Sequence, residues 1–264
     1  MIDYSFSIQE LEYFLLILVR VSCFVFAAPF WGENTIPGRV KIGTSVFIAI
    51  LLYYATAPHE VLMVETIIDL TTIILKEAAA GLLIGLGANI CTSVVLFAGR
   101  LVDVEMGLGM ASIMDPTSRE NATITGVYYR YMVMLIMIIS GMYQYLISAL
   151  AETFTLIPVG DVVINYDKIL DSFIVFMGEY MLIGLRICLP VFCTIMLLNA
   201  VLGILAKVAP QMNMFAVGIQ LKVLTGMAVL FFSVAMLPRV SDLIYTHMRQ
   251  MIVRMVEGLM NAGI

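Results

Sequence analysis

The side chains best suited to chemistry are few in this sequence, and they lie far apart. The two histidines, His59 and His247, are separated by most of the chain, and neither stands in the His-Glu-x-x-His pattern of a zinc protease. Neither lies in a long apolar segment, where an intramembrane serine protease needs a histidine facing its serine. We therefore expect no catalytic residue, no bound metal and no cofactor.

The cysteines and glycines also give no indication of a metal, disulfide or phosphate-binding site. The cysteines lie inside apolar segments, without a Cys-x-x-Cys pair or a neighbouring histidine, at positions 23, 91, 188 and 193. This placement is typical of buried thiols rather than of disulfides or metal ligands. The pattern Gly81-x-x-x-Gly85-x-Gly87 lies in an apolar segment and lacks the strand and lysine of a phosphate-binding loop. It favours close packing between helices instead.

Composition indicates an integral membrane protein of one domain. The 264 residues are 62% hydrophobic and 12% charged, against about 45–50% and about 25% in soluble domains. A net charge of −5 and the absence of a basic run exclude a nucleic-acid surface. Acidic residues precede the first apolar run, the reverse of a secretory signal peptide, so we expect that run to remain in the mature protein.

Six apolar segments organise the chain, and each is expected to be a helix. The segments are residues 13–30, 42–57, 73–98, 127–149, 173–206 and 214–237. The connectors between them each contain Pro or Gly. The predicted fold class is an all-α membrane-type protein with about six long helices. Basic connectors alternate with acidic ones, but Arg239, Arg249 and Arg254 follow the last segment and break the alternation that a simple topology requires.

The last third of the chain predicts a long helical hairpin. Residues 173–206 alone would span about 51 Å as a straight helix at ~1.5 Å per residue, more than a bilayer needs. Apolar residues recur at helical spacing over 240–259, so an amphipathic helix should extend the second arm. The turn falls at 208–213, where Pro210 supplies no N–H and polar side chains can cap helix ends. The residues assigned to this turn and to close packing beside it are Asn199, Gly203, Pro210, Gln211 and Asn213.

Ionisable residues inside the apolar segments need partners or water. Placing one charged side chain in hydrocarbon costs about 2.5–3.5 kcal/mol on insertion scales. Lys76, Glu77 and Arg130 lie near segment ends and have snorkelling at the interface as an alternative. The others are predicted to lie at subunit interfaces, and they are Arg20, Glu179, Arg186 and Lys222. For the last three the alternative is contact with one another across the hairpin.

A loop at 107–121 stands between two long uncharged stretches and is too apolar for an ordinary solvated connector. Its mixture of Gly, Met and one Asp-Pro pair favours a re-entrant or pore-facing element, which needs protein or a water-filled cavity around it at membrane depth. Met106, Met110 and Met114 would form one flexible stripe if the segment is helical. The alternative is a connector whose methionines pack on a helix.

Three motifs carry a resemblance to a known family. They are Ile36-Pro-Gly-Arg-Val-Lys-Ile-Gly43, Glu105-Met-Gly-Leu-Gly-Met-Ala-Ser-Ile-Met-Asp-Pro116 and Asn199-Ala-Val-Leu-Gly-Ile-Leu-Ala-Lys-Val-Ala-Pro-Gln-Met-Asn-Met-Phe-Ala-Val-Gly218. In this order, over nearly the whole chain, they resemble the FliR family of flagellar biosynthesis proteins, which has an injectisome branch. The loop at 107–121 is richer in Met than the family pattern.

The resemblance implies a subunit of the flagellar type III protein export gate in the bacterial inner membrane. Its implied partners are FliP-type and FliQ-type subunits, an FlhB-type switch protein and unfolded export substrates. Residues 1–170 would be FliP-like and 171–264 FliQ-like, with helices raised towards the periplasm in the basal body. The loop would be the pore plug, formed by Met106, Gly107, Gly109, Met110, Met114, Asp115 and Pro116. The alternatives are a secondary transporter or channel, and the equivalent injectisome subunit.

Overall fold

The computed structural model describes residues 8–33, 35–57, 66–108, 123–211 and 213–260, and over these ranges the regular structure is helical throughout. This confirms the all-α prediction. The elements are α1 (Ile8–Ala27), α2 (Gly38–Ala55), α3 (Ile67–Met106), α5 (Ile124–Ile139), α6 (Met142–Leu156), α7 (Tyr166–Val208), α8 (Met214–Ser233), the 3-10 turn η1 (Val234–Met236) and α9 (Leu237–Leu259).

Four helical stretches among the described residues are long and apolar enough to cross a membrane: Gly38–Ala55, Ile67–Met106, Tyr166–Val208 and Phe215–Leu259. The total is five if α5 and α6 count as one broken span. The first apolar segment does form α1, but Glu10, Glu12 and Arg20 keep it out of this set. Helices α3 and α7 extend beyond both ends of the predicted segments.

The segment predicted at 127–149 is not one helix, which corrects the sequence-based expectation. Helix α5 ends at Ile139 and α6 begins at Met142. Gly141 between them has a φ of 80°, a left-handed conformation that glycine adopts without steric cost and that a continuing helix excludes. Hydropathy could not detect this break, since the residues on both sides of it are apolar.

Contacts divide the chain into two compact units, each built from separated segments. Unit 1 comprises Met1–Cys91, Gly141–Phe176 and Thr246–Ile264, and unit 2 comprises Thr92–Ser140 and Met177–Tyr245. Helices α3, α7 and α9 each contribute a part to both units. The division of the chain at residue 170 therefore stays a prediction, since these units interleave N-terminal and C-terminal segments.

Unit 1 has a core made by the buried faces of α1, α3, α6 and α9. Gly81 and Gly85 of α3 lie against the backbone of α1, where an added Cβ would overlap the carbonyl oxygens of Arg20 and Phe24 respectively. The glycine spacing thus does allow two helices to approach closely. The tail helix is amphipathic as predicted, with its apolar residues buried at 248, 251, 252, 255, 256 and 259 and its intervening ones exposed at 249, 250, 253 and 257.

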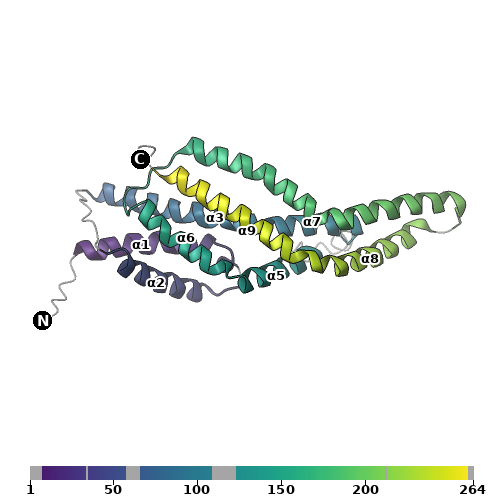
Figure 1. Cartoon of the computed structure of the whole chain (residues 1–264), viewed down its shortest axis with the longest axis horizontal. Coiled ribbons are helices and arrows are strands. Elements are labelled where there is room, and N and C mark those ends of the chain that lie inside the picture. The colour runs from purple at the N-terminus through teal and green to yellow at the C-terminus, as the bar shows by residue number, and fades with distance from the viewer. Residues whose placement is uncertain (1–7, 34, 58–65, 109–122, 212, 261–264) are drawn as a thin grey trace. The chain divides into compact units, whose positions relative to one another are not determined.

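Unit 2 contains the hairpin. Helix α7 ends at Val208 and α8 begins at Met214, as the sequence predicts, and α8 runs back beside α7 (Figure 1). A Cβ added at Gly218 of α8 would lie 3.5 Å from Leu202 of α7, an ordinary packing distance. The second arm has a 3-10 turn at η1, which ends two residues before Pro238, and a proline has no N–H to donate to an α-helical bond.

Candidate functional site

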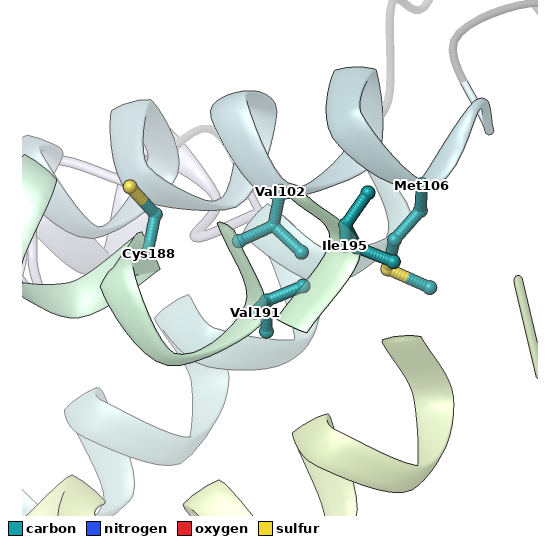
Figure 2. Close-up of a cluster of buried hydrophobic side chains, with 5 residues drawn as sticks. All are labelled: Val102, Met106, Cys188, Val191 and Ile195. Carbon is teal, nitrogen blue, oxygen red and sulfur yellow. The ribbon is translucent and has the colours of Figure 1, made fainter. Parts of the chain in front are cut away.

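The C-terminal end of α3 packs into a buried apolar cluster in unit 2. Val102 and Met106 come from α3, and Cys188, Val191 and Ile195 come from the facing side of α7 (Figure 2). All are at most 3% exposed. Partly buried side chains from α8 complete the cluster, which joins the end of α3 to both arms of the hairpin. The segment that follows α3 therefore starts from a firmly packed base.

Met106 belongs to this base and not to the loop, which corrects its assignment to the plug. It is the last residue of α3, is fully buried, and its side chain fills the space over Gly226 of α8. The proposed stripe of methionines therefore loses its first member. Gly107 follows with a φ of 80° and ends the helix.

The rest of the predicted plug lies outside the described residues. These are Gly109, Met110, Met114, Asp115 and Pro116, all within 109–122. Their role remains a prediction from the sequence. The structure does describe the two ends of the segment, Gly107 and Leu108 before it and Thr123 after it.

Sequence analysis missed Asp103, which links α3 to the start of α5. Asp103 is 5% exposed, and its carboxylate accepts a hydrogen bond from the backbone N–H of Thr125, whose nitrogen lies 3.2 Å and 3.3 Å from the two carboxylate oxygens. The sequence did contain a signal for the role of Asp103. An acidic residue in the last turn of a helix is unfavourable next to the negative end of the helix dipole, which indicates that it has a partner elsewhere. The partner is the N-terminal end of α5.

Arg20 lies in a closed polar network inside unit 1. Its guanidinium makes two bonds to the Glu77 carboxylate, one of them 3.0 Å from Nη2 to Oε1, and both side chains are at most 1% exposed. Nη1 donates to the carbonyls of Thr153 and Ile157, and the guanidinium stacks 4.4 Å from the centre of the Phe154 ring. The Glu77 carboxylate also accepts from Gly160 N–H at 2.9 Å.

This network corrects the assignment of Arg20 to a subunit interface, because Arg20 has no surface left for a neighbouring subunit. For Glu77 it favours a buried partner over the alternative of snorkelling at the interface. The network joins α1, α3, α6 and the connector after α6 through one pair of charges. Its opposite charges in two apolar segments were visible in the sequence, but their pairing depends on tertiary packing.

The other charged residues of the predicted interface lie in unit 2. Glu179 and Lys222 are partly exposed, on α7 and α8, and Arg186 is exposed on α7. Contact with neighbouring subunits therefore stays a prediction for Glu179, Arg186 and Lys222.

The hairpin turn is held by backbone and side-chain caps. Asn213 accepts a hydrogen bond from Ala216 N–H at 3.4 Å, and its carbonyl accepts from Val217 N–H at 3.2 Å, so the predicted capping role of Asn213 is confirmed. Pro210 and Gln211 are exposed in the turn. On α7, Asn199 is partly exposed and Gly203 is exposed, with open space where its Cβ would be.

Replacement of Asn213 by alanine is expected to destabilise the start of α8 by about 1 kcal/mol, the usual loss for an N-cap side chain. Hydrogen exchange at Ala216 should become several-fold faster. Gln211→Ala is the matched control in the same turn and should leave this amide unchanged. Equal exchange at Ala216 in both variants would show that the Asn213 cap does not hold the helix end.

Acidic residues, cysteines and histidines do not gather anywhere in the described part of the chain. No group of three or more that could hold a metal occurs there. The four cysteines are free thiols. The described residues do provide packed helices, one enclosed ion pair and a large exposed apolar surface, as expected of a membrane protein.

The chain belongs to the bacterial export proteins, family 1, whose model matches residues 11–248. Among similar proteins is the flagellar biosynthetic protein FliR of Bacillus subtilis (strain 168), 27% identical over 214 residues, which are 80% of this chain and 81% of that protein. FliR of Aquifex aeolicus (strain VF5) is 28% identical over 225 residues, 84% of this chain and 85% of that protein. FliR of Escherichia coli (strain K12) is 26% identical over 219 residues, 81% and 80% of the two chains. The resemblance seen in the motifs is confirmed, and with its apolar helices the chain is a membrane protein of an export family.

Proposed function

We propose that this protein is a subunit of the flagellar type III protein export gate and helps to form the conduit for unfolded flagellar proteins across the inner membrane. The observation that carries the proposal is the family match over residues 11–248. The similar proteins named above are all flagellar, which favours the flagellar over the injectisome role. A transporter of small solutes has no comparable support.

The gate needs partners, and the surface of the hairpin is suited to them. Large apolar side chains are exposed on both arms, including Leu197 at 70%, Leu224 at 70%, and Phe231 and Phe232 at 76% each. Such a surface must be covered by lipid or by other apolar helices. FliP-type and FliQ-type subunits cover it in the assembled gate, and an FlhB-type protein binds nearby. In this proposal residues 1–170 are the FliP-like portion and 171–264 the FliQ-like hairpin.

Residues 107–121 are the plug of the conduit. The support comes from sequence: small residues allow close approach in a narrow passage, and methionine side chains adapt to an irregular apolar surface and exclude water. The buried cluster at the end of α3 gives this segment a fixed starting point.

The assembly is tested by purifying the tagged chain from its native membranes in mild detergent. We expect a complex far larger than the 29.2 kDa chain, containing FliP-type and FliQ-type subunits. Lys222→Met should lower the yield of the complex by about tenfold, because it leaves a partner charge uncompensated at an interface. Lys207→Met, an exposed lysine at the turn, is the matched control.

A monodisperse monomer in mild detergent would contradict the assembly. Equal yields of complex from the Lys222 and Lys207 variants would reject the interface role of Lys222 but leave the assembly itself in place. The two results can therefore be separated.

A further inference from the structure

The helix that precedes the plug segment ends in a Schellman motif. Leu108 N–H donates to the Asp103 carbonyl at 2.9 Å, and Gly107 N–H donates to the Val104 carbonyl at 3.1 Å. The left-handed φ of Gly107 completes this pattern, in which the last carbonyls of a helix are satisfied by the two residues that follow it. The backbone of Asp103 thus fixes the chain as it enters residues 109–122.

The side chain of the same residue fixes the chain as it leaves them. Thr123 occupies the N-cap position of α5 but makes no side-chain cap bond. The Asp103 carboxylate takes its place by accepting from Thr125 N–H. A carboxylate at this point also satisfies the positive end of the α5 dipole.

Close backbone packing brings the two helices within reach of this bond. A Cβ on Gly99 of α3 would overlap the backbone of Gly126, so α5 can lie this close to α3 only because residue 99 is glycine. Thr125 is 2% exposed, so the bond between Asp103 and Thr125 is shielded from water. An amide N–H without this acceptor would be buried and unpaired, which is unfavourable.

We propose that Asp103 is the positioning residue that holds both ends of the 109–122 segment, its carbonyl at the entry and its carboxylate at the exit. Its effect on the seal of the conduit rests on the proposed function of that segment. The end of α3 and the start of α5 are thereby held at one fixed separation.

The anchor is tested by hydrogen exchange of the full chain in its detergent-solubilised complex. Asp103→Ala should make the Thr125 amide exchange about tenfold faster, as expected for the loss of an N-cap acceptor. Asp103→Asn keeps an acceptor oxygen but loses the charge, so a smaller increase of about threefold is expected. Glu105→Gln removes the same charge from the same turn of α3 and should leave Thr125 unchanged. Unchanged exchange at Thr125 in Asp103→Ala overturns the anchor.

The effect on the seal is read from ion leakage across membranes that contain each assembled variant. We expect leakage to rise in the order wild type, Asp103→Asn, Asp103→Ala, with Glu105→Gln equal to wild type. If replacing residues 109–121 causes leakage while Asp103→Ala stays tight, Asp103 does not position the segment and the inference fails. If replacing the segment causes no leakage, the plug assignment fails, and the exchange data decide the anchor by themselves.

Discussion

Replacing Arg20 by methionine is expected to destabilise the protein by about 3–5 kcal/mol, because Glu77 would remain buried without its partner charge. The backbone carbonyls of Thr153 and Ile157 would lose the hydrogen bonds from the guanidinium in the same step, although the Thr153 carbonyl would still accept from Ile157 N–H. The methionine side chain can fill part of the space but donates no hydrogen bond. We expect the variant to be recovered at low yield and to unfold at a clearly lower temperature in detergent.

The double variant Arg20→Met with Glu77→Gln separates the charge from the packing. Removing both charges leaves polar groups but no isolated buried ion, so part of the lost stability should return. Arg39→Met, an exposed arginine at the start of α2, is the control for a change of arginine to methionine and should unfold like wild type. A single variant as stable as the control would show that the network contributes little.

The helical structure of the apolar segments and their approximate positions were predictable from the sequence, because long apolar runs separated by Pro and Gly determine both. The hairpin turn was predictable too, since Pro210 and Asn213 mark a helix end and a helix start. Helix ends were less predictable. The break at Gly141 depends on a single left-handed residue within an apolar run, and glycine occurs elsewhere in unbroken helices of this chain, at Gly85 for example.

Pairings of distant residues could not be predicted from spacing. Arg20 and Glu77 meet because Gly81 lets α1 approach α3, and Asp103 reaches Thr125 because Gly99 lets α5 do the same. In both cases a glycine contact decides which polar groups face each other. Hydropathy treats a buried charge as a cost that a partner must remove, and for Arg20 it pointed to another subunit, whereas the chain itself supplies Glu77.

Met106 shows the same limit at the candidate plug. Its spacing from Met110 and Met114 suggested one stripe, but α3 continues to Met106 and buries it against Gly226. Residue type alone does not say where a helix stops. The Schellman motif at Gly107 does, and it separates the packed base from the segment that follows.

Replacing residues 109–121 by a short Gly/Ser linker is expected to make the assembled gate leak ions or small solutes. The replacement keeps Gly107 and Leu108, so the cap of α3 and its buried cluster stay intact. The ends of α3 and α5 are already held together by Asp103 and Thr125, and a short linker can therefore join them without strain on the helices. Assembly should be close to wild type.

The physical reason is that a conduit wide enough for an unfolded chain must be closed to water when no substrate is present. An apolar constriction achieves this by excluding water, and flexible thioether side chains can do so without a fixed partner surface. The measurement is the decay of an ion gradient across vesicles that contain the assembled complex, with Gln211→Ala in the hairpin turn as a control that should remain tight. If the replacement variant assembles and holds the gradient as long as wild type, the segment is an ordinary connector and the seal lies elsewhere in the gate.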